Sequence, residues 1–152
     1  MNVQSDVAAI LLAIGCGVAI GLERELKGKA AGLRTNVLIC LGAAVFTIIS
    51  RQMGDGQESV TRIAAQIVTG VGFLGAGAVI QDRGGIHGLT TAATIWLVAS
   101  IGMACGAKLY ELAIITTALA IVVLLGLAQV DKRIRPNGNN KKIEPQRDTE
   151  PL

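Results

Sequence analysis

Five long stretches without a charged side chain dominate this sequence. They cover residues 7–22, 35–50, 63–81, 84–107 and 112–130. A helix that crosses a bilayer needs about 20 mostly apolar residues, and the last three stretches come close to or exceed this length. The first two have 16 residues each, so they need basic side chains at their ends that reach toward the headgroups. The pattern predicts an all-α, polytopic membrane protein, a bundle of about five transmembrane helices.

Composition supports one membrane domain followed by a tail. Charged residues make up 16% of the 152 residues, against about 25% in soluble domains, and the mean hydropathy is +0.56. We predict a transmembrane domain over residues 1–130. Residues 131–152 hold three prolines, three asparagines, mixed charges and almost no apolar side chains. This composition predicts a disordered, basic and polar cytoplasmic tail.

The distribution of Lys and Arg predicts the orientation, because basic residues concentrate on the cytoplasmic side of membrane proteins. If the loop between the first two spans is cytoplasmic, eleven basic residues face the cytoplasm and three face the other side. We therefore expect the N-terminus outside and the C-terminus inside. The short connection at residues 108–111 predicts that the fourth and fifth spans form a helical hairpin.

Charges of both signs concentrate between the first and second spans. The candidates for a functional rim there are Glu23, Arg24, Glu25, Arg34, Thr35 and Asn36. Because consecutive spans are antiparallel neighbours, Glu23 and Arg34 lie where two helix ends meet, and pairing would lower the cost of placing either charge near hydrocarbon. The alternative is that all four charges extend separately to the interface, and the residues alone do not choose between the two.

This rim does not predict a metal site. Magnesium prefers carboxylates without neighbouring cations and keeps most of its water, whereas basic residues surround these two acids. We predict no metal site and no cofactor. The three cysteines, Cys16, Cys40 and Cys105, each lie in an apolar stretch and form no C-x-x-C pair. We expect them to be small apolar filler, without a disulfide framework or a zinc site.

Glycines mark the third span. Gly70, Gly72 and Gly75 match the letters of a dinucleotide-binding fingerprint, but that motif needs a strand, a turn and a following helix. With Gly77 they instead predict a helix face almost free of side chains, on which a neighbouring helix packs. A broken helix with a substrate site is the less favoured alternative. Two further glycine pairs, at residues 17 and 21 and at residues 102 and 106, fit packing within the bundle or dimerisation equally well.

Few polar side chains lie within the spans. The candidates for helix packing or for an ion path are Gln66, Thr90, Thr91 and Thr94. We expect Thr90 and Thr91 to cap the fourth helix, and Trp96 to pack toward the bundle interior. His87, the single histidine, is expected to be solvated at the cytoplasmic surface instead of serving as a ligand.

Several blocks of this sequence resemble the MgtC/SapB family of bacterial membrane proteins. They are GLERE at 21–25, AGLRTN at 31–36, LGAAVF at 41–46, RIAAQIVTGVGFLGAGAVI at 62–80 and GLTTAATIW at 88–96. The resemblance spans about residues 10–130 and implies a multi-pass protein of the bacterial inner membrane, linked to magnesium limitation and, in some members, to virulence and survival inside macrophages. It also implies a regulator of another membrane protein, such as a proton-translocating ATP synthase or a P-type ATPase, and so of membrane potential.

This chain departs from some virulence-associated members, which carry a further soluble domain and have Asn where this chain has Thr90. It resembles the short type that has only the membrane domain. We favour a regulatory protein that contacts the bilayer and another membrane protein, with homo-oligomerisation left open and nucleic acid excluded. The alternative is a magnesium or other ion transporter or channel, whose path would include Gln66, Thr69 and the threonines of the fourth span. We predict no enzyme, because no nucleophile–base pair is visible.

Overall fold

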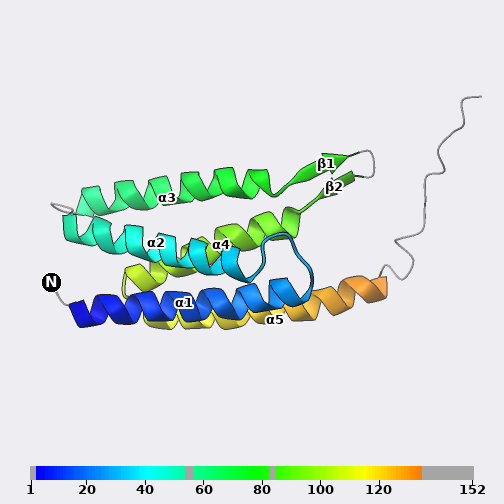
Figure 1. Ribbon diagram of the computed structural model, residues 1–152, viewed down its shortest axis with the longest axis horizontal. Helices are drawn as coiled ribbons and strands as arrows, with labels where there is room; N and C mark the ends of the chain where they lie inside the picture. Colours follow the sequence, from blue (N-terminus) through cyan, green and yellow to red (C-terminus); the bar gives the residue numbers. More distant parts are fainter. Residues whose placement is uncertain (1–2, 54–56, 83–84, 135–152) are drawn as a thin grey trace, which may run out of the picture.

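The computed structural model describes residues 3–53, 57–82 and 85–134. Its elements, in order, are α1 (Val3–Leu26), α2 (Leu33–Met53), α3 (Gln57–Gly77), β1 (Ile80–Asp82), β2 (Gly85–His87), α4 (Leu89–Gly106) and α5 (Tyr110–Ile134). Consecutive helices run in opposite directions, so α1 begins at one end of the bundle and α5 finishes at the other (Figure 1). The predicted all-α bundle is confirmed, with one small β-hairpin added.

Within residues 3–53, 57–82 and 85–134, four helices are long and apolar enough to cross a membrane. They are α1, α2, α4 and the first 18 residues of α5, Tyr110–Leu127. α3, which spans Gln57–Gly77, is not among these four. It nevertheless makes the same end-to-end passage as its neighbours (Figure 1). The protein is therefore a multi-pass membrane protein.

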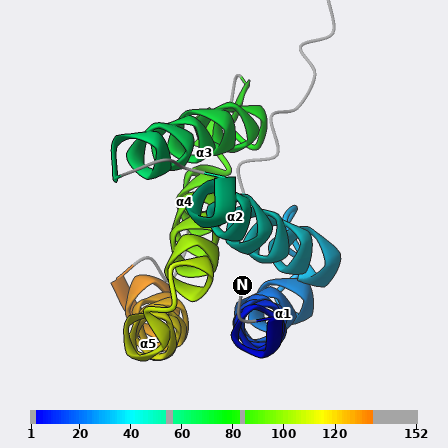
Figure 2. The ribbon, with the colours of Figure 1, turned by 90° about the vertical axis from the view of Figure 1, so that its left-hand side faces the viewer.

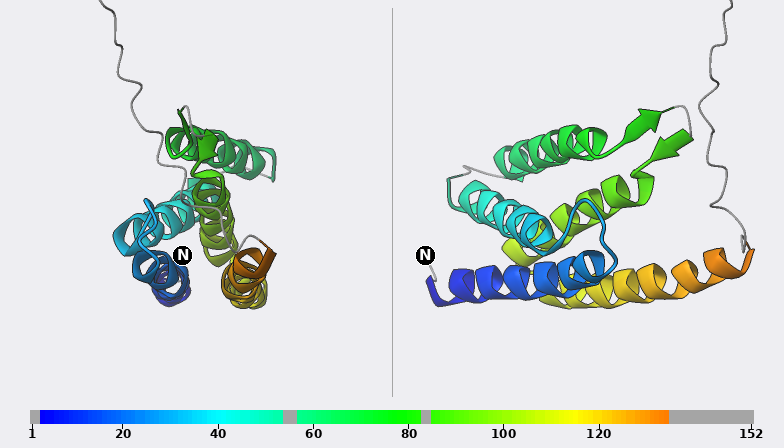
Figure 3. Two further views of the ribbon diagram at one scale, coloured as in Figure 1. Left: turned by 90° about the vertical axis from the view of Figure 1, so that its right-hand side faces the viewer. Right: turned by 45° about the vertical axis from the view of Figure 1, so that its right-hand side comes forward.

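α2 and α4 lie at the centre of the bundle. Seen end-on, α3 lies on one side of this central pair, and α1 and α5 lie on the other (Figures 2 and 3). One core cluster joins α1, α2, α4 and α5 and includes Ile20, Cys40 and Val98. A second cluster joins α2, α3 and α4 and includes Ile67 and Ile95. The most extensive helix contacts are those of α2 with α1 and with α4.

Glycines allow α1 to lie directly on the backbone of α2. A Cβ atom added at Gly17 would lie 2.9 Å from the Cα of Val37, and one added at Gly21 would lie 2.9 Å from the Cα of Leu33. Real Cβ atoms do not approach backbone so closely, so these positions accommodate no larger residue without separating the helices. This glycine pair therefore serves packing within the chain.

The second glycine pair allows α4 to approach α2 from another side. A Cβ atom added at Gly106 would lie 2.5 Å from the carbonyl oxygen of Ala44, and one at Gly102 would meet the carbonyl oxygen of Cys40. The sequence left open whether the two glycine pairs serve packing within the bundle or dimerisation. In the structure both pairs contact helices of the same chain. α2 receives both neighbouring helices at distances that only glycine permits.

The predicted packing face on α3 is wrong for three of its four glycines. A Cβ atom added at Gly70, Gly72 or Gly77 would have no described heavy atom within 4 Å. Only Gly75 faces a neighbour, the Cβ of Ala92 in α4, at an ordinary contact distance of 3.8 Å. The reason is the rotation of α3, which turns the face bearing Ile67 and Val71 toward the bundle, while Gly70 and Gly77 line open hollows beside α2 instead of a close helix contact.

A β-hairpin separates α3 from α4, whereas two spans divided by a short loop were expected. β1 and β2 are antiparallel, with Ile80 opposite His87. Glycines account for the break, because Gly85 and Gly88 have φ angles of 129° and 87°, a region that other residues adopt only with strain. A Cβ atom at Gly88 would also meet the carbonyl oxygen of Ala78. By contrast, the predicted hairpin of the last two helices is confirmed, with α4 ending at Gly106 and α5 beginning at Tyr110.

Candidate functional site

The end of α1 carries a pair of buried charged residues. α1 continues through the charged block to Leu26 because Glu, Arg and Leu all favour helix. It ends there, two residues before Gly28, whose φ of 60° lies in the left-handed region. Within the last turns of this helix Glu23 is 8% exposed and Arg24 is 3% exposed. Charged side chains are rarely buried to this degree unless they are paired.

Three helices contribute to the surroundings of these two charges. Lys27 Nζ lies 2.6 Å from Glu23 Oε1, and Arg24 Nη1 lies 3.8 Å from Glu23 Oε2. Arg24 Nη2 also donates a hydrogen bond to the hydroxyl of Thr91 in α4, at 3.2 Å. Lys27 Nζ donates to the backbone carbonyl of Leu124 in α5, at 3.1 Å. We call these five residues the inner cluster. It joins α1 to α4 and α5 at one end of the bundle.

The charge balance of the inner cluster determines what it can bind. One carboxylate, Glu23, faces two cations, Arg24 and Lys27, so the group carries a net positive charge. A further cation such as Mg²⁺ would have to displace one of them, and Mg²⁺ prefers carboxylates that are free of cations. Arg24 Nε is buried and has no hydrogen-bond partner among the described atoms. Such a group has hydrogen-bonding capacity for water or for an anionic group.

The predicted ion pair between Glu23 and Arg34 is wrong. Arg34 is exposed and forms no ion pair with any residue that the structure describes. Because α1 extends beyond Glu23, Lys27 lies one turn away on the same helix face and becomes its partner. The alternative, in which every charge of the rim reaches water, is wrong for the buried Glu23 and Arg24 and describes only Arg34 and Glu25, which are exposed.

Other rim residues hold the connection between α1 and α2. Glu25 accepts a hydrogen bond from the backbone N–H of Leu33 at 2.9 Å, and so satisfies an amide at the start of α2. Asn36 is fully buried, and its Nδ2 donates to the carbonyl oxygens of Ala31 and Gly32, both at 2.8 Å. The turn is thus fixed by side chains from both helices that it connects. Thr35 is exposed beside it.

The threonines of α4 divide between two environments. Thr91 and Thr94 are each 4% exposed, and Thr94 donates to the carbonyl oxygen of Thr90 at 2.7 Å. Thr90 is exposed. The prediction that Thr90 and Thr91 cap α4 is wrong, because the helix begins one residue earlier at Leu89 and Gly88 is its N-cap, without a side-chain bond. The hydroxyl of Thr91 instead accepts a hydrogen bond from the guanidinium of Arg24.

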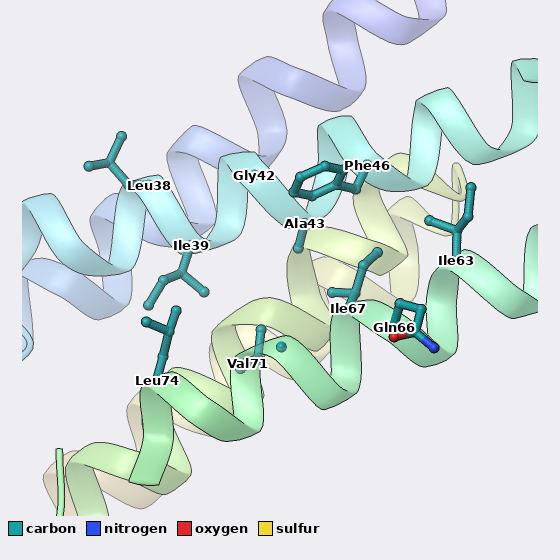
Figure 4. A pocket seen from close by; sticks show the side chains of 11 residues that line it. Leu38, Ile39, Gly42, Ala43, Phe46, Ile63, Gln66, Ile67, Val71 and Leu74 are labelled. Carbon is teal, nitrogen blue, oxygen red and sulfur yellow. The ribbon is translucent and has the colours of Figure 1, made fainter. Parts of the chain in front are cut away.

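Two further side chains lie apart from the inner cluster. Gln66 is exposed on α3, where it lines a groove between α2 and α3 (Figure 4). The expectation that Trp96 packs toward the interior is wrong, since its side chain is 53% exposed. In a membrane such a ring contacts lipid. The structure therefore brings together Glu23, Arg24 and Thr91 but leaves Gln66 and Arg34 separate.

Sequence reasoning missed a second charged group at the opposite end. Asp6 Oδ1 lies 3.5 Å from Lys108 Nζ and 3.8 Å from Arg51 Nη1. Arg51 also donates to the carbonyl oxygen of Gly106 at 2.7 Å, and Gln52 donates to Asp6 Oδ2 at 2.9 Å. The expected order of antiparallel helices could have predicted this group, because it places the start of α1, the end of α2 and the α4–α5 turn at the same end of the bundle.

The three cysteines meet in the core. Cys16 of α1, Cys40 of α2 and Cys105 of α4 are all buried in one hydrophobic cluster, and all are free thiols. Their separation along the chain concealed this proximity, which the crossing of three helices creates. Their burial among alanine, valine and isoleucine agrees with the expected role as small apolar residues.

Comparison with known proteins identifies the family. The family model described as the MgtC family matches residues 10–133, most of the chain. The chain belongs to the MgtC family. It is 45% identical over 141 residues to YhiD of Escherichia coli strain K12, whose name describes a candidate magnesium transporter, and this match covers 88% of the chain and 65% of YhiD.

Other relatives of this MgtC-family chain carry the name MgtC. The protein from Brucella abortus strain 2308 is 47% identical over 107 residues, covering 70% of the chain and 44% of the relative. The protein from Salmonella typhimurium strain LT2 is 42% identical over 125 residues, covering 82% of the chain and 53% of the relative. The chain thus spans about half to two thirds of the length of these relatives. No solved structure is a significant match.

Proposed function

We propose that this MgtC-family protein regulates magnesium-linked ion homeostasis, or membrane potential, by acting on another membrane protein. The observation that carries the proposal is the placement of its ion-paired charged groups. They gather at the two ends of the bundle, around Glu23 and around Asp6, and an apolar cluster that includes Ala13, Val98 and Ile101 lies between them. Thr117, which is buried beside that cluster, donates to the carbonyl oxygen of Ala113 in its own helix. A conducting path would need polar groups along its length.

The arrangement of the expected path residues supports the same proposal. Gln66 and Thr69 are exposed on α3, and Thr69 donates to the backbone of its own helix. The carboxylate of Glu23 is already engaged by Arg24 and Lys27. Ion transport by this chain is the second candidate, and the name of the relative YhiD favours it. For this chain, the geometry supports a fixed charged end better than a cation-binding centre.

The location and partner follow from the same proposal. We place the protein in the bacterial cytoplasmic membrane with its N-terminus outside and the inner cluster on the cytoplasmic side, as the distribution of basic residues favours. A proton-translocating ATP synthase or a P-type ATPase is the class of partner that the family resemblance favours. Such a partner would respond to a rigid surface at the inner end, built from the turn between α1 and α2 and from the start of α4.

Flux measurements on the purified full chain test the proposal. In liposomes loaded with a magnesium-sensitive dye or a proton-sensitive dye, we expect the same flux with and without the protein. In cells grown at low magnesium, we expect the membrane potential to depend on the protein, and Thr91→Val to weaken the effect by removing the acceptor for Arg24. Thr69→Val is the matched control, because Thr69 is exposed on α3, outside the inner cluster, and its hydroxyl donates to the carbonyl oxygen of Ala65 in its own helix. Saturable magnesium flux that Glu23→Gln abolishes would instead establish transport.

A further inference from the structure

A groove of about 680 Å³ runs along the contact between α2 and α3. Its walls are aliphatic apart from Phe46 and Gln66, and Ile39 and Leu74 point toward one another across it (Figure 4). Toward the inner cluster the groove continues into a second hollow of about 570 Å³, which shares Leu38, Ile39 and Leu74 with the first. We call the two together the α2–α3 groove. It is open to the side of the bundle that faces lipid.

The length of the α2–α3 groove matches one leaflet of a bilayer. Along α2 it extends from Arg34 to Phe46, and the twelve helical steps between them span about 18 Å at 1.5 Å per residue. Half of a hydrocarbon core about 30 Å thick is about 15 Å. The groove thus begins at the level of the headgroups and ends near the middle of the membrane. A single acyl chain covers the same depth.

The inner end of the groove is positively charged. Arg34 is the one charged residue among those described in its walls, and it forms no ion pair with the residues that the structure describes. It lies in the first turn of α2, where the helix dipole adds positive potential. The nearby carboxylate of Glu25 is held by the N–H of Leu33. A phosphate group at this end would therefore meet an available guanidinium, its preferred partner.

The lining favours a phospholipid acyl chain over a helix, because the walls are aliphatic along most of the groove and the one described charge, Arg34, lies at its headgroup end. The narrow space exists because Gly42 and Gly70 line it without side chains, and a Cβ added at either glycine would have no described heavy atom within 4 Å. We propose that the α2–α3 groove binds one acyl chain of an anionic phospholipid, whose phosphate is held by Arg34.

Lipid retention by the full chain tests this proposal. The protein is reconstituted in equal parts phosphatidylglycerol and phosphatidylcholine, purified in mild detergent, and its retained lipid is measured by native mass spectrometry. We expect the wild type to retain phosphatidylglycerol selectively. Gly42→Leu and Gly70→Leu fill the groove and should reduce retention about tenfold, the effect of about 1.4 kcal/mol. Arg34→Gln should abolish the preference for phosphatidylglycerol while leaving the fold unchanged, because Arg34 is exposed.

Gly126→Leu is the matched control. Gly126 is an exposed glycine of α5 that also has no described heavy atom within 4 Å of an added Cβ, but it lies away from the groove. Its substitution should leave lipid retention unchanged. Equal loss in the Gly126 variant would indicate lipid bound without a site and would overturn the proposal. Unchanged selectivity in Arg34→Gln, or loss of a dimer or protein partner with lipid retained in Gly70→Leu, would overturn it as well.

Discussion

Replacing Gly102 by alanine should destabilise the bundle, whereas the same change at Gly72 should not. The added Cβ at position 102 would lie 2.9 Å from the carbonyl carbon of Cys40 and 3.0 Å from the Cβ of Ala43. Carbon atoms prefer separations of about 3.5–4.0 Å, so α4 and α2 would have to move apart by several tenths of an ångström or more. Overpacking of this kind typically costs about 1–3 kcal/mol.

The comparison between the two glycines isolates this steric cost. Each substitution also gains up to about 1 kcal/mol because alanine favours helix more than glycine, and this gain cancels in the difference. At Gly72 the new methyl group would enter open space. We therefore expect the free energies of unfolding of the two variants to differ by about 1–3 kcal/mol, with Gly102→Ala the less stable.

Unfolding in mixed detergent micelles measures this difference. Trp96 is the single tryptophan and lies on α4, so its fluorescence reports the separation of that helix. The wild type and both variants are unfolded by increasing denaturing detergent, and their midpoints are compared. Equal midpoints for Gly102→Ala and Gly72→Ala would refute the conclusion that α4 contacts α2 through its glycine face.

Three other substitutions test the two ends of the bundle. Arg24→Ala leaves Glu23 buried with one cation, Lys27, and should reduce the free energy of unfolding by up to about 3–5 kcal/mol if the site is dry. The loss should appear as a lower yield of folded protein in size-exclusion chromatography; a normal yield would mean that water solvates Glu23. Asn36→Ala removes the side-chain donor of the buried Ala31 carbonyl, while the Gly32 carbonyl keeps the backbone N–H of residue 36, and should lower the free energy of unfolding by about 1–3 kcal/mol; an unchanged melting temperature would show that the turn holds without this side chain. Asp6→Asn should cost about 1 kcal/mol or less, and the loss should shrink in high salt; a salt-independent loss would mean that packing, not charge, matters at Asp6.

The sequence could predict the helices because the bilayer restricts the choice so strongly. Backbone groups in hydrocarbon must be paired within a helix or a closed barrel, so long uncharged stretches leave few alternatives. The hairpin between α3 and α4 escaped prediction, since the stretches on both sides of Arg83 are apolar and glycine-rich. Its cause is the backbone conformation of Gly85 and Gly88, which an apolar pattern does not report.

The partners in the candidate site were harder to predict because they depend on the rotation of each helix. Lys27 could have been found from the sequence, as it lies four residues after Glu23, but ending the helix at Leu22 removed it from consideration. The contact of Arg24 with Thr91 joins residues 67 positions apart. Likewise, which glycines of α3 face a neighbour depends on how the helix is rotated to bring Ile67 and Val71 against the bundle, and the spacing of the glycines alone does not report that rotation.

The central position of α2 has a consequence for synthesis. α1 and α2 can pack as soon as both have entered the membrane, since they are consecutive. The other glycine contact joins Ala44 to Gly106, which is made 62 residues later, roughly 3–12 s at 5–20 residues per second. During that interval the small-residue side of α2 has only lipid beside it. A nascent chain stalled between α2 and α4 would therefore display an unmatched surface on which another helix could dock incorrectly.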